Sequence, residues 1–236
     1  MRRLKPLVKQ ALGPKVLGML DYYRFPERRE SWGGPFNAQQ GRVCIFNALC
    51  DHLDFSAIVE TGTFRGTTTK YMAGKSGVPV FTVERDARLF GFAKMRFTGK
   101  ATIKTVNSDS RVFLRTIIRK EAMENKTTLF YLDAHWGDDL PLCEELEIIF
   151  GTSDRAVVMI DDFKVPDDPG YTYDDYGEGI ALTPEYIAPV VDKYRLSHFY
   201  PSAGSEVETG ACRGCVVLAN NVEILHKIND LQELRS

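Results

Sequence analysis

Short apolar runs alternate with longer stretches of helical spacing from about residue 40 onwards. The runs are rich in β-branched and aromatic residues and read AIVET, VPVFTVE, ATIKTVNSD, TTLFYLD and AVVMIDD. Between them, apolar residues recur at helical intervals in segments such as RVFLRTIIRKEAME and LPLCEELEIIF. Buried strands separated by helices are typical of a parallel sheet that is covered on both faces.

The last part of the chain has a different pattern. Two apolar runs, RLSHFYPS and RGCVVLAN, are joined by the polar segment SAGSEVETGAC, which favours an antiparallel hairpin at the sheet edge. We therefore predict an α/β fold: a Rossmann-like, doubly wound, mostly parallel sheet of seven strands with a C-terminal antiparallel hairpin. Residues 41–236 would form this domain, and a chain of 236 residues can bury one such core.

Residues 1–40 form a separate region in this interpretation. Five Lys and Arg precede the first acid, Asp21, and apolar residues recur at helical spacing, so we predict a basic amphipathic helix interrupted near Gly13-Pro14. A polar connector with Gly33-Gly34-Pro35 follows. The helix could dock on the main body, on a second subunit to give a homo-oligomer, or on an anionic membrane surface, and we favour docking on protein.

Composition excludes several classes of function. A net charge of -2 and a sequence pI near 6.1 provide no basic field for nucleic acid. No apolar run approaches the roughly 20 residues of a membrane span, so we expect no transmembrane segment and a cytoplasmic protein. The five cysteines form no disulfide framework, and Cys212 and Cys215 lack a second ligand pair for zinc.

Carboxylates stand at the end of every predicted parallel strand. The carboxyl ends of such strands share one edge of the sheet, where ligands bind at the point at which the strand order reverses. Acids gathered at one crevice repel one another, so a purely structural sheet would not collect them there. The acids are Glu60, Glu84, Asp109, Asp133, Asp161 and Asp162.

The first strand end has features of a nucleoside-cofactor site. In ETGTFRGTTT, Gly62 permits a tight turn and Gly66 a close backbone approach, although the third glycine of a dinucleotide fingerprint is missing. Glu84 follows Gly62 by 22 positions, where a carboxylate can accept from both ribose hydroxyls. The charge of Glu60 suits a cation, such as the amino or sulfonium group of S-adenosylmethionine, better than a pyrophosphate.

The motifs ETGTFRGTT, FTVE, FYLDAHW and VVMIDDF together resemble class I S-adenosylmethionine-dependent methyltransferases. Within that class they resemble the metal-dependent O-methyltransferases, such as catechol O-methyltransferase and the macrocin and novobiocin O-methyltransferase family. The resemblance covers roughly residues 40–220. It implies a cofactor-binding role for seven residues, with Glu84 at the ribose and Asp109 near the adenine: Glu60, Gly62, Thr63, Gly66, Glu84, Asp109 and Trp136.

Three carboxylates are expected to converge on a divalent cation. Asp133 ends the fourth strand and Asp161-Asp162 end the fifth, and the motifs themselves contain no basic residue to neutralise them. Magnesium prefers such oxygen ligands, and the resembling families use the same strand ends for their metal. The cation would lower the pKa of a substrate hydroxyl and orient its oxygen toward the methyl donor.

The general base is less well defined by the sequence. The lysine that follows the Asp-His-Trp of catechol O-methyltransferase has no equivalent here, because Ala134 intervenes and Gly137-Asp138 follow. His135 is the nearest candidate base, with Asp133 or the metal alone as alternatives. Trp136 either forms a wall of the methionine pocket or packs beneath the loop.

A long acidic and tyrosine-rich segment follows the fifth strand, DDFKVPDDPGYTYDDYGEGIALTPEYI. Such a loop at the active edge is often a substrate loop, in which Tyr171, Tyr173 and Tyr176 would stack on a ring and Asp167, Asp168, Asp174 and Asp175 would meet hydroxyls or an amine. The substrate would be a small hydroxylated molecule, a sugar or a phenol. Two alternatives stay open: an NAD(P)-binding oxidoreductase and a non-catalytic S-adenosylmethionine-binding protein.

Overall fold

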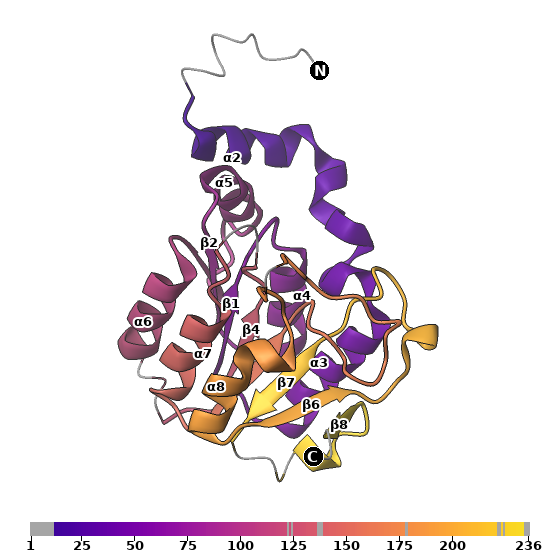
Figure 1. The fold of residues 1–236 in the computed structure, drawn as a ribbon. Coiled ribbons are helices and arrows are strands. Elements are labelled where there is room, and N and C mark those ends of the chain that lie inside the picture. Colours follow the sequence, from indigo (N-terminus) through magenta and orange to yellow (C-terminus); the bar gives the residue numbers. More distant parts are fainter. Residues whose placement is uncertain are drawn as a thin grey trace.

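An eight-stranded sheet lies between two layers of helices in the computed structural model of the chain (Figure 1). The structure describes residues 12–121, 123, 125–135, 139–177, 179–220, 223 and 225–233. The strand order is β3-β2-β1-β4-β5-β7-β6-β8. The strands are β1 Ala57–Thr61, β2 Val80–Glu84, β3 Ile103–Asn107, β4 Thr128–Leu132, β5 Ala156–Ile160, β6 Ser197–Pro201, β7 Val216–Ala219 and β8 Leu231–Glu233.

Strands β1 to β5 are parallel, and their order reverses between β1 and β4. The pairing of Thr61 with Leu132 brings the ends of these two strands level. Strand β7 pairs antiparallel with β5, and β6 pairs antiparallel with β7. The predicted Rossmann-like fold with a C-terminal antiparallel hairpin is confirmed. The sheet has one strand more than predicted, because β8 is a three-residue strand too short to produce an alternating pattern.

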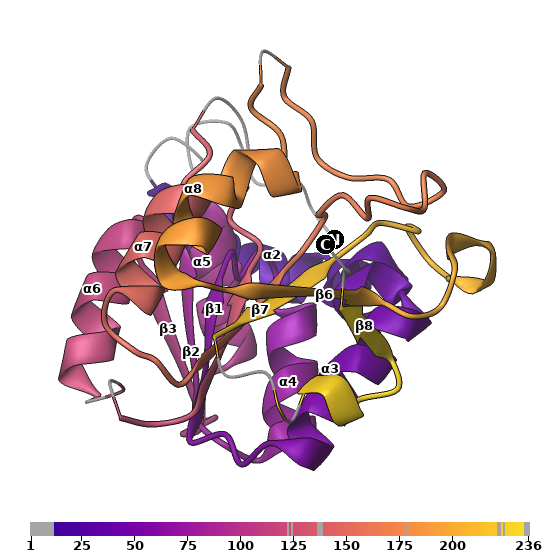
Figure 2. The same ribbon diagram turned by 60° about the horizontal axis from the view of Figure 1, so that its bottom comes forward.

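The two faces of the sheet bury alternate residues of each strand. Ile58 packs with the cluster under α3 and α4, whereas Val59 packs with the cluster under α6, α7 and α8. Figures 1 and 2 show these two helical layers on opposite sides of the sheet. The helices are α3 Gln40–His52, α4 Thr67–Ser76, α6 Ser110–Lys120, α7 Leu142–Phe150 and α8 Pro184–Tyr194.

A second helix pair lies at one end of the molecule. Helix α2 (Pro14–Arg24) packs on α5 (Ala87–Arg96), and the short helices η1 (Pro26–Gly33) and η2 (Pro35–Ala38) lead from α2 to the main body (Figure 1). Helix α2 begins at the predicted interruption, whereas residues 1–11 of the predicted basic helix lie outside the described residues. The remaining short helices are η3 (Ser205–Val207) and η4 (Leu225–Lys227).

None of the helices in the described part of the chain is long and apolar enough to span a bilayer.

Candidate active site

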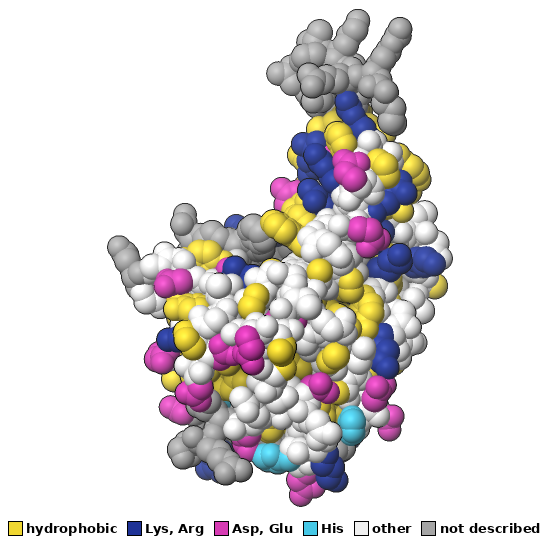
Figure 3. Space-filling view, turned by 90° about the vertical axis from the view of Figure 1, so that its right-hand side faces the viewer, with side chains coloured by type: hydrophobic (Ala, Val, Ile, Leu, Met, Phe, Trp, Pro, Cys, Tyr) yellow, Lys and Arg dark blue, Asp and Glu magenta, His cyan; other side chains and the backbone are white. Residues whose placement is uncertain are grey.

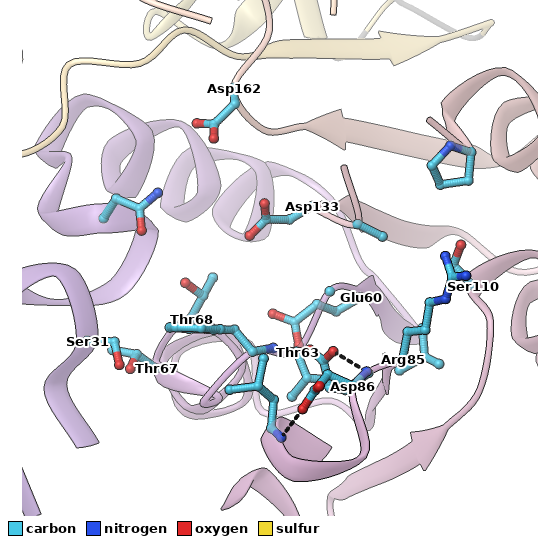
Figure 4. A pocket seen from close by; sticks show the side chains of 18 of the residues that line it. Ser31, Glu60, Thr63, Thr67, Thr68, Arg85, Asp86, Ser110, Asp133 and Asp162 are labelled. Carbon is cyan, nitrogen blue, oxygen red and sulfur yellow. Dashed lines mark hydrogen bonds between the residues drawn. The ribbon is translucent and has the colours of Figure 1, made fainter. Parts of the chain in front are cut away.

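A cavity of about 1030 Å³ opens at the carboxyl ends of β1, β2, β4 and β5. It lies at the reversal of strand order, where the fold predicts a ligand. Figure 4 shows Asp133 between Asp162 and Glu60, with all three carboxylates on the strand-end side. The lining contains seven of the predicted site residues: Glu60, Gly62, Thr63, Glu84, Asp109, Asp133 and Asp162.

The turn after β1 requires glycine at residue 62. Gly62 has a φ of 89°, and a Cβ atom at this position would lie 2.0 Å from the carbonyl oxygen of Asp133. The turn thus passes directly against the end of β4. Gly66, with a φ of 74°, is the N-cap of α4, and its Cβ would meet the Phe97 ring at 2.5 Å. Gly66 does not line the cavity, so the close approach that it permits is to the Phe97 ring.

Glu60 is buried at the end of β1 with only 1% of its surface exposed. Its Oε2 accepts hydrogen bonds from the Thr69 and Thr82 hydroxyls, each at 2.5 Å. Burial raises the pKa of the Glu60 carboxyl to about 8. The carboxyl is therefore mostly neutral at pH 7 until a cation lies beside it, unlike the fixed charge expected from the sequence. Thr63 lies nearby, with its hydroxyl 2.5 Å from that of Thr82.

Glu84 ends β2, the strand next to β1, and lines the cavity. Its Oε2 accepts from the backbone N–H of Phe64 at 2.7 Å, and its Oε1 accepts from that of Asp86 at 2.9 Å. These bonds fix both oxygens and leave lone pairs for a ligand hydroxyl. Burial raises the pKa of this carboxyl above its usual value.

Asp109 follows β3 and caps α6. Its carboxylate accepts from the backbone N–H of Arg111 at 2.9 Å and forms an ion pair with the Arg111 side chain at 2.8 Å. The guanidinium holds the pKa of Asp109 below its usual value and also binds Asp139, beyond β4. Asp109 thus lines the cavity with its charge already paired, and the contact with an adenine amine stays a prediction.

The three predicted metal ligands do come together. Asp133, Asp161 and Asp162 each offer a carboxylate oxygen, and these oxygens lie within 4.8 Å of one another. Asp161 is buried behind the other two at 1% exposure. Burial, followed by the charges of Asp162 and Glu60, raises the pKa of Asp133 well above its usual value. Asp162 also has a φ of 52°, a left-handed conformation that is strained for a non-glycine residue.

Two arginines from outside the strand-end motifs partly neutralise this cluster. Arg42, buried on α3, forms an ion pair with Asp161 and lies 3.7 Å from Asp162. Arg213, from the turn before β7, contacts Asp162 Oδ1 through its Nε at 2.8 Å and forms an ion pair with Asp174. Both arginines come from segments far from the strand-end motifs, so inspection of those motifs could not find them.

His135 is buried beside the cavity and is not among its described lining residues. Its Nε2 lies 3.1 Å from the carbonyl oxygen of Leu132, which fits an N–H donor at that nitrogen. Burial lowers the pKa of the imidazole to about 4. This geometry argues against His135 as the general base and indicates that it supports the end of β4. Trp136 lies outside the described residues.

The loop between β5 and α8 contributes fewer residues to the cavity than predicted. Asp174 and Tyr176 line it, and the Tyr176 hydroxyl lies 2.8 Å from Asp174 Oδ2 and also within hydrogen-bonding distance of the carbonyl of His135, so its single proton is donated to one or shared between the two. Tyr171 is instead buried and donates to the carbonyl of Ala203. Asp168 accepts from the backbone and hydroxyl of Ser205 and so shapes the loop.

The polar connector supplies a wall of the cavity that the sequence did not indicate. Ser31, Trp32, Gly34 and Asn37 line it. Trp32 and Asn37 each have a φ of 56°, and Gly34 has a φ of 149°. Positive φ values at non-glycine residues such as Trp32 and Asn37 concentrate at binding sites. In the sequence, Gly33-Gly34-Pro35 predicted a turn here but did not show that the turn lines the cavity.

Comparisons with known proteins establish the class of fold. No protein-family model and no curated protein matches the sequence. Among solved structures, an O-methyltransferase from Bacillus cereus in complex with SAH is similar over 90% of this chain and 94% of its own, with 16% identity and a TM-score of 0.53. The methyltransferase domain of bacterial CtHen1 is similar over 76% and 98%, with 15% identity and a TM-score of 0.53.

A candidate O-methyltransferase from Klebsiella pneumoniae is similar over 91% of this chain and 94% of its own, with 16% identity and a TM-score of 0.52. The chain therefore has the fold of the methyltransferases. At these identities the likeness concerns the fold, and the chemistry has to be argued from the cavity.

Proposed function

We propose that this protein is an S-adenosylmethionine-dependent O-methyltransferase that uses Mg²⁺ or another divalent cation. The acceptor would be a hydroxyl of a small molecule, such as a sugar or a phenol. One observation supports this most directly: a single cavity has a nucleoside-binding wall at Glu60 and Glu84 next to the acidic cluster at Asp133 and Asp162. We also propose a cytoplasmic location, because all five cysteines are free thiols and disulfides are rare in that compartment.

The chain's own residues would hold the donor in a defined orientation. Glu84, with both oxygens fixed by backbone N–H groups, accepts from the ribose hydroxyls. Gly62 lets the backbone approach the methionine end, and the Glu60 carboxyl becomes ionised beside the donor's positive groups. Together these residues point the reacting end of the donor toward the acidic cluster at the end of β4.

The acidic cluster fits a divalent cation by charge and by ligand type. Within the described part of the chain, two guanidiniums, those of Arg42 and Arg213, accompany the four carboxylates of Asp133, Asp161, Asp162 and Asp174, which leaves two negative charges unmatched when all six are ionised. Carboxylate oxygens are the ligands that Mg²⁺ prefers. Asp133 and Asp162 would hold the ion on the cavity side and Asp161 from behind. When bound, the ion supplies Lewis-acid chemistry that acidifies an acceptor hydroxyl.

The same observations disfavour the alternatives. A dinucleotide places its pyrophosphate at the first strand-to-helix turn, yet the groups beside that turn are the carboxyls of Glu60 and Asp133, which supply no positive charge for it whether protonated or ionised. A protein that merely binds S-adenosylmethionine needs no second group of acids around the end of β5, and the strained φ of Asp162 would serve no purpose there.

Calorimetric titration tests the proposal. S-adenosylmethionine and NADH are titrated separately into the protein with and without Mg²⁺, and Mg²⁺ is then titrated into Asp162→Asn. We expect binding of S-adenosylmethionine alone, and weaker Mg²⁺ binding by at least about tenfold in the variant, since one charged ligand is lost. Asp154→Asn, which removes an exposed acid far from the cavity, should bind both ligands like the unmodified protein.

Two results would reject parts of the proposal separately. Absence of S-adenosylmethionine binding would reject the methyltransferase activity altogether. Binding of S-adenosylmethionine with Mg²⁺ affinity unchanged in Asp162→Asn would reject the metal site and keep the donor site. A screen of hydroxylated acceptors with radiolabelled donor then measures transfer itself.

A further inference from the structure

Helix α2 has one face that the rest of the described chain leaves uncovered. Val16, Leu20 and Tyr23 are exposed at 42%, 39% and 58%. Their spacing of four and three residues places them in a row along one side of the helix. These apolar side chains add nothing to the core, so their presence requires another explanation.

The opposite face of α2 is fixed tightly to α5. A Cβ on Gly18 would lie 1.8 Å from the carbonyl oxygen of Arg88, and one on Gly91 would lie 2.0 Å from that of Lys15. An ion pair of 2.6 Å between Asp21 and Arg88 adds a charged contact. The backbones therefore touch, and α2 is held in an orientation that keeps Val16, Leu20 and Tyr23 pointing away from the protein.

The stretch of sequence that contains this row is rich in basic residues. Residues 1–29 contain eight Lys and Arg and two acids, of which Asp21 is buried and paired with Arg88. Subtracting these from the 30 Lys and Arg and 32 Asp and Glu of the whole chain leaves 22 bases against 30 acids in the remainder. Figure 3 shows Lys and Arg side chains beside hydrophobic ones on the part of the surface that α2 and the connector form.

We propose that α2 docks this protein on an anionic phospholipid bilayer, with the row Val16, Leu20 and Tyr23 inserted among the headgroups. An apolar row on a basic helix has the composition of an interfacial membrane-binding helix. Basic side chains add attraction to anionic lipid, and tyrosine suits the boundary between acyl chains and headgroups. Docking is independent of the proposed methyl transfer and concerns a different surface.

Two other occupants fit the surface less well. A symmetric dimer through α2 would bring the same basic segment of two copies together, and like charges would repel. Nucleic acid would attract the basic residues, but its phosphate backbone offers no apolar partner to Val16 and Leu20. The anionic bilayer satisfies both the apolar row and the charge.

Vesicle flotation tests the proposal with the full chain. Vesicles of phosphatidylcholine with phosphatidylglycerol are compared with vesicles of phosphatidylcholine alone, at low and high salt. We expect binding to the anionic vesicles only, and less of it at high salt because counterions screen the attraction. The triple variant Val16→Ser, Leu20→Ser, Tyr23→Ser should lower the bound fraction about tenfold, since three apolar contacts are removed.

The matched control is Val112→Ser, Val207→Ser, which removes exposed apolar side chains of similar exposure, 57% and 65%, away from α2. This variant should bind vesicles like the unmodified protein, and both variants should keep the unmodified thermal midpoint. Three results would overturn the proposal: no binding to anionic vesicles, equal binding by the triple variant, or a dimer in light scattering that the triple variant abolishes. The dimer would make a second copy of the chain the occupant.

Discussion

Arg42 of α3 forms a buried ion pair with Asp161 at the end of β5, and both side chains are 1% exposed. The same guanidinium donates to the carbonyl oxygens of Arg213 and Gly214, at 2.5 Å and 3.0 Å. Arg42 thus joins the acidic cluster to the turn that carries the second arginine. Arg42 compensates the cluster from the protein side and Arg213 from the cavity wall, and among the described residues neither forms an ion pair with Asp133.

Replacing Arg42 should strongly destabilise the fold. Arg42→Met leaves the Asp161 carboxylate buried without its partner, which costs about 3–5 kcal/mol of unfolding free energy. Urea denaturation measures this loss, and the exposed Arg119→Met should change the unfolding free energy little. Millimolar Mg²⁺ should stabilise Arg42→Met more than the unmodified protein, because the freed carboxylate gains a new counter-ion. An unchanged denaturation midpoint in Arg42→Met would contradict the buried ion pair.

Glu84 should determine the affinity for the nucleoside part of the donor. Glu84→Gln retains the shape but replaces one accepting oxygen with an amide donor, which loses a charged hydrogen bond to a ribose hydroxyl, worth roughly 1.5–3 kcal/mol. Calorimetry should therefore show S-adenosylhomocysteine bound about 10- to 100-fold more weakly. If the affinity stays within twofold, Glu84 does not contact the ribose. The exposed Asp154→Asn again serves as the control.

The fold was largely predictable because its signals are local. Each of the seven predicted strands coincides with an observed strand, since buried runs such as AIVET and TTLFYLD are short, apolar and bounded by polar residues. The acids after these runs reach one edge as a direct result of parallel pairing. Strand β8, at three residues, carries no such signal.

The counter-charges of the site depend on tertiary packing and could not be predicted. Arg42 lies in an ordinary helical stretch, and Arg213 stood out only as part of the Cys212–Cys215 spacing. Nothing in either motif indicates that α3 and the turn before β7 meet at β5. The burial of His135 could not be predicted either, because a histidine after a strand has the same sequence context whether it faces the cavity or the core.

The donor's affinity should depend on pH through Glu60. Its pKa of about 8 means that the carboxyl is protonated at pH 6 and ionised at pH 9 in the free protein. The ionised form attracts the positive groups of S-adenosylmethionine, so binding should strengthen as pH rises from 6 to about 8 and level off above. The slope is at most tenfold per pH unit.

Glu60→Gln isolates this contribution, because the amide keeps an oxygen for the Thr69 and Thr82 hydroxyls but has no proton to lose. The ratio of the dissociation constants of the variant and the unmodified protein should increase between pH 6 and 8. Taking the ratio also cancels the titration of the ligand's own amino group. A ratio that is constant across this range would show that Glu60 does not sense the donor's charge.

His135 should matter for stability and not for proton transfer. Its imidazole is buried and neutral, with a pKa lowered to about 4, and Nε2 donates to the Leu132 carbonyl at 3.1 Å. His135→Ala removes that donor and leaves a cavity, so the unfolding free energy should fall by about 1–3 kcal/mol. His52→Ala removes an exposed imidazole that also contacts a carbonyl, that of Ala48 at 2.9 Å, and should lower the unfolding free energy much less.

The pH dependence of the methyl-transfer rate separates a general base from a supporting residue. A general base would give an ascending limb near its pKa that vanishes in His135→Ala, whereas a supporting residue changes the rate by a similar factor at every pH.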